Sequence, residues 1–288
     1  MSLAWLGTLP FFVYMLAFLF VPAGEVMVGA FKGAHSGWTF QNVRLLFDSP
    51  YWQYYRSSIQ ISLITALAGA AVGTAIAYSA IREGTPRWVR GILSTFSGVA
   101  ANFGGIPLAF AFIATIGTLG IVTNLLNSVF GINPYRHHYW VSYNLFQHTP
   151  YLGYPGIEIV YLYFQIPLMF LVIAPAIDGL KPAWREAASN LGASSWQFWR
   201  YVGLPVLAPS IMGAVILLFG NAFSAYATAY AINNGIPLVP IVIGAYYQGN
   251  VLDNPHLAQA LAFGMFVVLA LMMIIYIPLN RRAARWSK

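Results

Sequence analysis

Six long runs of apolar residues restrict what this chain can fold into. They span about Leu9–Val28, Ile59–Ile81, Gly91–Leu119, Ile157–Ala176, Leu207–Ile232 and Leu257–Leu279. A bilayer core about 30 Å thick needs roughly 20 apolar residues in a helix that rises about 1.5 Å per residue. Only 7% of the residues are charged, whereas soluble domains carry roughly 25%. The sequence therefore predicts an all-α, polytopic membrane protein with six transmembrane helices.

The order of these runs suggests two regions. Residues 1–55 hold the first transmembrane helix and an outer loop, and residues 56–288 hold a core with five transmembrane helices. The first run lacks a basic start and a clear small-residue cleavage site, so we interpret it as a membrane span rather than a signal peptide. The third run contains Gly104-Gly105-Ile106-Pro107, where a missing backbone donor and added backbone freedom predict a kink or a break.

The distribution of Lys and Arg predicts the orientation. With the N-terminus inside, ten basic residues fall on the inner side and four on the outer side. The inner ones are Arg82, Arg87, Arg90, Lys181, Arg185, Arg200, Arg281, Arg282, Arg285 and Lys288, and the outer ones are Lys32, Arg44, Arg56 and Arg136. Because cytoplasmic loops carry this excess, we expect both termini on the cytoplasmic side of the membrane. The net charge of +7 then suits anionic membrane lipid and not nucleic acid.

Two outer loops, residues 31–56 and 120–155, are rich in aromatic residues. The densest patch is Tyr135-Arg136-His137-His138-Tyr139-Trp140. One interpretation is an aromatic belt with an interfacial helix, and another is a docking surface for an external partner. Adjacent histidines rarely share a ligand face, and no cysteine or acidic cluster completes a metal site here.

A short amphipathic segment, about residues 181–209, separates the fourth and fifth runs. Pro182 suits the first turn of a helix, and Gly192 supplies the left-handed residue that commonly ends one. Ser194 or Ser195 can cap a second helix that leads into the fifth run. The segment therefore predicts a helix, a glycine turn and a second helix that is continuous with a transmembrane helix. The alternative is an interfacial helix anchored only by its tryptophans.

The same segment has an ordered pattern of residues. Its fixed positions are Glu186, Ala187, Ala188, Gly192, Leu204 and Pro205, with Val202 where isoleucine is usual. This pattern resembles the EAA signature of permease subunits of bacterial ABC importers. The resemblance implies a type I importer fold in a bacterial inner membrane. These six residues would belong to a cytoplasmic coupling loop whose helix docks on an ATPase subunit, with Glu186 near the contact and Gly192 at the bend.

The resemblance also implies partners. These are two ATP-binding subunits, a second permease subunit that is more often a different chain than a copy, a periplasmic substrate-binding protein and the membrane lipid. The chain itself would be no enzyme, with no catalytic residue, metal or cofactor, because ATP and magnesium would bind the partner ATPase.

The sequence contains no energy source of its own. None of the three lysines stands in the GxxxxGK[ST] context of a P-loop. The seven acidic residues all fall at span ends or in loops, whereas ion-driven carriers place ionisable groups inside the membrane. Energy would therefore arrive through a partner. An ATP-independent secondary transporter or channel is the main alternative. An enzyme using His35, His137, His138, His148 or His256 has no supporting triad or metal spacing.

The fifth run offers a candidate substrate path. On a continuous helix, Asn221, Ser224 and Thr228 share one polar face, and Tyr226 and Tyr230 share the opposite one. Asn102 on the third run, Tyr78 and Gln165 are further candidates. The polar face is equally consistent with helix–helix packing.

The phrase from Gly220 to Ala231 resembles the fifth span of permeases in the spermidine/putrescine-type branch. The resemblance implies a polyamine or another small polar solute as cargo. Aromatic residues could contact an amine through cation–π interactions, but no carboxylate lies deep in a span to meet a polycation. The cargo therefore stays open at this point.

Overall fold

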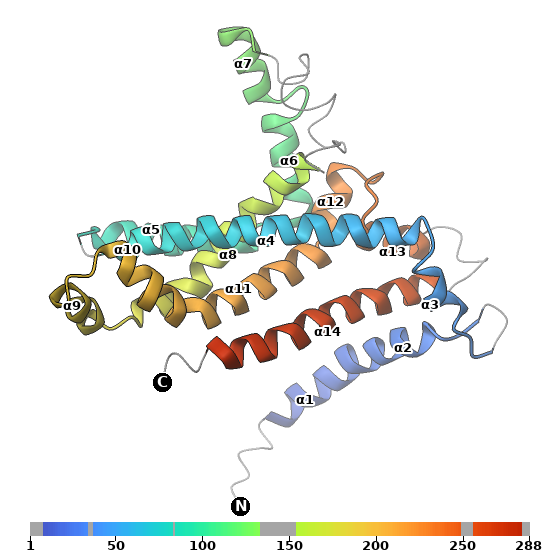
Figure 1. The fold of residues 1–288 in the computed structure, drawn as a ribbon. Helices are drawn as coiled ribbons and strands as arrows, with labels where there is room; N and C mark the ends of the chain where they lie inside the picture. The colour runs from blue at the N-terminus through green and yellow to red at the C-terminus, as the bar shows by residue number, and fades with distance from the viewer. Residues whose placement is uncertain (1–7, 34–36, 83, 133–153, 249–255, 284–288) are drawn as a thin grey trace, which may run out of the picture. The chain divides into compact units, whose positions relative to one another are not determined.

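The structure is a computed structural model that describes residues 8–33, 37–82, 84–132, 154–248 and 256–283, with side chains described up to residue 278. In these ranges the regular elements are helices, and the only extended pairing is an isolated bridge between Lys32 and Trp38. The predicted all-α fold is confirmed (Figure 1). The aromatic patch at residues 135–140, with His137 and His138, lies outside the described residues, as do His35 and His148.

Six helical stretches are long and apolar enough to cross a membrane, as predicted. They are Leu9–Gly29, Tyr51–Ile81, Gly105–Phe130, Pro155–Asp178, Ser195–Ser224 and Leu257–Pro278. The third differs from the prediction of Gly91–Leu119, because the chain breaks after Asn102. The residues before the break form a separate helix, α5 (Arg87–Asn102), and those after it form α6 (Gly105–Ile116) and α7 (Ile121–Phe130).

The chain forms two compact units, and the first comprises residues 1–56 and 237–270. Its helices are α1 (Leu9–Met15), the π-helical segment η2 (Leu16–Phe20), α2 (Val21–Gly29), α3 (Gln41–Leu45), α13 (Val239–Gln248) and the first half of α14 (Leu257–Ala283). The Tyr55 hydroxyl donates a hydrogen bond to the Leu261 carbonyl. Gly264 leaves the space for that tyrosine, because a Cβ there would lie 2.2 Å from the hydroxyl oxygen. This unit therefore joins an early segment to a late one.

The second unit, residues 57–236 and 271–288, is built around α8 (Pro155–Asp178). Helix α4 (Tyr51–Ile81) packs closely on α8 through two glycines four residues apart. A Cβ on Gly69 would lie 2.8 Å from the Gln165 Cβ, and one on Gly73 would lie 2.6 Å from the Met169 Cβ. Small residues at this spacing let transmembrane helices approach closely. Helices α5 and α11 (Leu204–Ser224) also pack on α8.

The fifth run breaks where the sequence predicted one continuous helix from Leu207 to Ile232. Helix α11 ends at Ser224, and a short helix, α12 (Ala227–Ile232), follows. The reason is tertiary, since the freed Ala225 carbonyl accepts a hydrogen bond from the Tyr161 hydroxyl at 3.0 Å. Backbone groups freed within a membrane need such partners. No glycine or proline marks this break in the sequence, so local rules do not predict it.

Candidate functional site

The amphipathic segment folds as the predicted elbow. Helix α9 (Pro182–Asn190) begins at Pro182, and Gly192 adopts the left-handed conformation with φ of +76°. No residue of α9 is buried, and Leu191 is 88% exposed. Glu186 and Ala187 are exposed and Ala188 is half-buried. The described part of this chain therefore covers the apolar side of α9 only in part.

The second arm of the elbow is capped and continuous with the fifth span. Ser194 Oγ accepts the Gln197 N–H at 3.3 Å, and Gln197 Oε1 accepts the Ser194 N–H at 2.7 Å. This reciprocal pair is a capping box, which satisfies two free donors at a helix start. From there α10 (Ser195–Phe198), the π-helical segment η3 (Trp199–Gly203) and α11 form one helical run of 30 residues. Leu204 and Pro205 open α11 inside that run. The second arm of the elbow and the span are thus a single rod.

One contact holds the elbow to α4, and a second joins the neighbouring helices α5 and α8 just before the elbow begins. The Trp199 ring meets the Tyr78 ring of α4 edge to face, with centroids 4.7 Å apart. Gly203 makes room for the tryptophan, because a Cβ there would lie 2.6 Å from the Trp199 ring. Arg90 of α5 makes a two-pronged ion pair with Asp178 at the end of α8. Sequence reasoning missed this pair, since opposite charges at two helix ends do not reveal that they meet.

A second feature is a cavity of about 230 Å³ at the two helix breaks. It brings together four predicted path residues, namely Asn102, Asn221, Tyr226 and Thr228, with the backbone of Gly104 and Gly105. Its lining contains amides, hydroxyls and apolar side chains but no charged group. The cavity therefore suits a neutral or weakly held polar solute.

The other predicted path residues lie elsewhere. Ser224 and Tyr230 do not line the cavity: the Ser224 hydroxyl donates to the Gly220 carbonyl at 2.9 Å, and the Tyr230 ring lies 5.3 Å from that of Tyr226. Gln165 is fully buried and donates to the Leu218 carbonyl at 2.8 Å. Tyr78 belongs to the elbow contact. The cavity therefore does not include these four residues.

The predicted opposition of Tyr226 to the polar face is wrong. It assumed an unbroken helix, and the break after Ser224 turns Tyr226 toward the same cavity as Asn221 and Thr228. Thr228 is only 4% exposed and its hydroxyl is bonded to Gly105. It therefore links the two breaks, and the side chains of Asn102, Asn221 and Tyr226 line the cavity beside it. No group of three metal-ligating side chains occurs among the described residues.

Comparison with known proteins gives a consistent result. The family described as "Binding-protein-dependent transport system inner membrane component" matches residues 85–285. The sulfate transport permease CysW of Synechocystis is 25% identical over 272 residues, covering 93% of this chain and 87% of that one. A spermidine/putrescine permease PotC homolog of Mycoplasma pneumoniae is 22% identical, covering 94% and 89%.

Solved structures show the same fold. A chain of a bacterial ABC transporter that imports alginate superposes with a TM-score of 0.73 at 19% identity, covering 97% of this chain and 95% of that one. The match includes the six membrane-crossing helices that the sequence predicts. The chain therefore belongs to the binding-protein-dependent transport system inner membrane component family, as a multi-pass permease subunit of an ABC importer.

Proposed function

We propose that this chain forms half of a translocation pathway and that its elbow transmits ATP-driven motion from an ATPase subunit. The observation that carries the proposal is the contrast within the elbow. Helix α9 buries none of its residues, while the arm after Gly192 is one rod with α11. A partner that moves α9 would therefore swing the fifth span. Glu186, Ala187 and Ala188 would contact the ATPase, and Gly192 would set the angle between the arms.

The charge distribution supports a cytoplasmic position for the elbow. Ten basic residues against four favour both termini inside. The sequence has no P-loop and no acidic residue deep in a span, so ATP and magnesium would bind two partner subunits. Closure of those subunits would bias the permease toward an outward-facing state, and hydrolysis would reset it, as a ligand biases a two-state equilibrium.

A second permease subunit and a periplasmic binding protein would complete the transporter. The alginate transporter whose chain this one resembles has been crystallised in complex with an alginate-bound periplasmic protein. The names of the relatives do not select one cargo, because they include sulfate and spermidine/putrescine. We therefore infer the class of cargo from the site. The uncharged cavity at the helix breaks favours a small polar solute held weakly, with selection mainly by the binding protein.

An ATP-independent carrier or channel is the competing function, and reconstitution separates the two. The chain would be purified from its own membrane and tested for co-purifying subunits with a P-loop. Proteoliposomes of the purified material would then be assayed for uptake with ATP, with a non-hydrolysable ATP analogue and without nucleotide. We expect an ATPase to accompany the chain and uptake to require hydrolysable ATP. Uptake by the isolated chain at the same rate without ATP would refute the proposal.

A further inference from the structure

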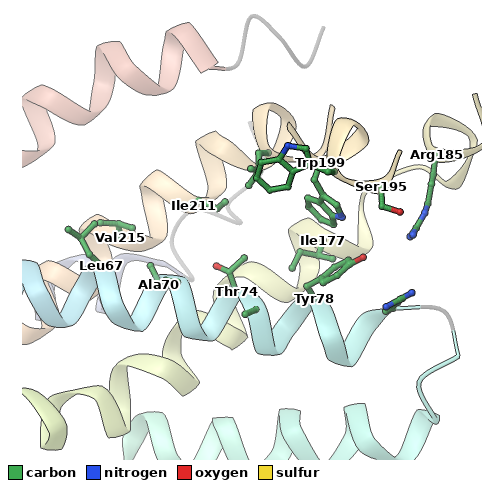
Figure 2. A pocket seen from close by; sticks show the side chains of 15 residues that line it. Leu67, Ala70, Thr74, Tyr78, Ile177, Arg185, Ser195, Trp199, Ile211 and Val215 are labelled. Atoms are coloured by element: carbon green, nitrogen blue, oxygen red, sulfur yellow. The ribbon is translucent and has the colours of Figure 1, made fainter. Parts of the chain in front are cut away.

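A long groove runs between α4 and the Ser195–Ser224 rod, with a volume of about 760 Å³ (Figure 2). Its two ends differ in polarity. One end is lined by Leu67, Ala70, Ala71, Ile211 and Val215, and the other by Arg82, Arg185 and Ser195. Figure 2 shows Arg185 and Ser195 at the end opposite Leu67 and Val215. The groove is therefore amphipathic along its length, and its volume lies in the range of about 300–1,000 Å³ typical of small-molecule sites.

The length of the groove corresponds to one leaflet of a bilayer. Leu67 on α4 and Arg82 just past its end both line it, and this step of 15 residues corresponds to about 22 Å at 1.5 Å per residue. Half of a hydrocarbon core of about 30 Å, with the polar headgroup region, has about this depth. A transmembrane helix of another subunit would need a groove across the whole core, so the length favours a lipid.

The charges at the polar end point to an anion. Among the described residues that line the groove, none is acidic. Neither Arg82 nor Arg185 has an ion-pair partner within the described parts of the chain, where Arg90 and Asp178 form the salt bridge. Two guanidinium groups at the end of an apolar groove match a phosphate, which arginine binds through paired hydrogen bonds.

One further polar atom lies on the groove wall without a partner. Thr74 Oγ1 is buried and makes no hydrogen bond to the described residues. A hydroxyl in a transmembrane helix usually bonds the carbonyl one turn earlier, as Thr65 does with Ile61. The Thr74 hydroxyl is thus a polar group beside the groove whose hydrogen bond is not satisfied by the described residues.

We propose that this groove binds an anionic phospholipid, with one acyl chain between α4 and α11 and the phosphate at Arg82 and Arg185. The bound lipid would lie against the Tyr78–Trp199 contact, since both rings line the groove. It would thus fill the space between α4 and the rod that the elbow moves. The lipid site is inferred from the groove itself. That the lipid belongs to the cytoplasmic leaflet depends on the proposed function, which places the elbow in the cytoplasm.

Lipid retention tests the site on the full chain in nanodiscs that contain phosphatidylglycerol and phosphatidylcholine. Native mass spectrometry would compare the wild type with R82Q/R185Q and with the charge-matched control R87Q/R200Q, whose arginines do not line the groove. An arginine near anionic lipid contributes about fivefold to affinity, so retention of phosphatidylglycerol should fall about 25-fold in R82Q/R185Q. The control should retain it. Equal retention by all three proteins would overturn the proposal.

A photocrosslink identifies what covers the groove, and guards against loss of folding in the double variant. A diazirine side chain at position 71, which is exposed on the groove wall, would be activated in native membranes. We expect an adduct with the mass of an anionic phospholipid. In the retention assay, the variant A71F should also exclude this lipid from the groove. A crosslink to another protein chain would assign the groove to a subunit interface and overturn the proposal. The absence of any lipid adduct would overturn it as well.

Discussion

Thr228 and Gly105 exchange two hydrogen bonds across the two helix breaks. Thr228 Oγ1 accepts the Gly105 N–H at 2.8 Å and donates to the Gly105 carbonyl at 3.3 Å. One side chain thus satisfies both backbone groups of a glycine 123 residues away. Because unsatisfied backbone groups are costly in a membrane, this pair fixes α12 against α6 and shapes the cavity between them.

Replacing Thr228 with valine should destabilise the helix breaks. Valine keeps the shape but removes the hydroxyl, which leaves the half-buried Gly105 N–H without this partner, at a cost of about 1 kcal/mol or more. We expect a lower melting temperature in detergent and reduced uptake, while Thr228→Ser keeps both bonds and behaves nearly as wild type. A valine variant as stable as the serine variant would show that the pair contributes nothing.

Because Gly105 has a left-handed backbone, with φ of +72°, we predict that alanine destabilises the protein more at Gly105 than at Gly104. Gly105→Ala has ordinary space for its Cβ, 3.8 Å from that of Ala227, so its cost is the backbone strain of about 1–2 kcal/mol. Gly104 has an extended backbone and open space, so Gly104→Ala is the matched control. Chemical denaturation in detergent should separate the two variants, and identical midpoints would contradict the assignment.

Gly203→Ala should weaken coupling by displacing Trp199 from Tyr78. The new methyl group would lie 2.6 Å from the tryptophan ring, and relief of such overpacking typically costs about 1–3 kcal/mol. Uptake per ATP hydrolysed should fall, and Trp199→Leu should suppress the effect of Gly203→Ala in a double-mutant cycle. Gly98→Ala, a helical glycine with open space on α5, is the control. Additive effects of the two substitutions would indicate that they act independently.

The Arg90–Asp178 pair should orient the elbow more than it stabilises the fold. Both side chains are partly exposed, so the pair contributes at most about 1 kcal/mol to unfolding. We expect Arg90→Glu to reduce uptake with little change in melting temperature, and the exchange Arg90→Asp with Asp178→Arg to restore it. If the exchange failed to restore uptake, the ion pair between Arg90 and Asp178 would not be what transport requires at these positions.

Local rules predicted the elbow well because its determinants are local. Pro182 starts a helix, Gly192 accepts a left-handed conformation and Ser194 with Gln197 makes a capping box, and each depends on neighbours within a few residues. The break after Asn102 was equally readable from its glycines and proline. Six long apolar runs sufficed for the fold class.

Features that depend on distant partners were not predictable. The break after Ser224 is stabilised by Tyr161 and by Gly105 of another helix, so the fifth run looked continuous and Tyr226 was placed on the wrong face. The third span was misplaced because its two halves are separate helices. The groove beside α4 likewise forms only because the stretch from Leu67 to Arg82 lies next to the Ser195–Ser224 rod. Side-chain packing between helices carries this information, and a single sequence does not display it.

The geometry at Gly192 gives the most direct test of elbow coupling. Gly192 and Gly131 both have positive φ, +76° and +66°, and open space for a Cβ. Valine at either position therefore brings similar strain, about 1–2 kcal/mol or more, but only Gly192 lies in the elbow. Asparagine, which tolerates this conformation, is the conservative variant. The measurement is ATP-dependent uptake alongside ATP hydrolysis in proteoliposomes of the co-purified transporter. We predict that Gly192→Val lowers uptake per ATP by roughly tenfold or more, while Gly192→Asn and Gly131→Val remain near wild type. Wild-type uptake per ATP in Gly192→Val would contradict the coupling role of the elbow.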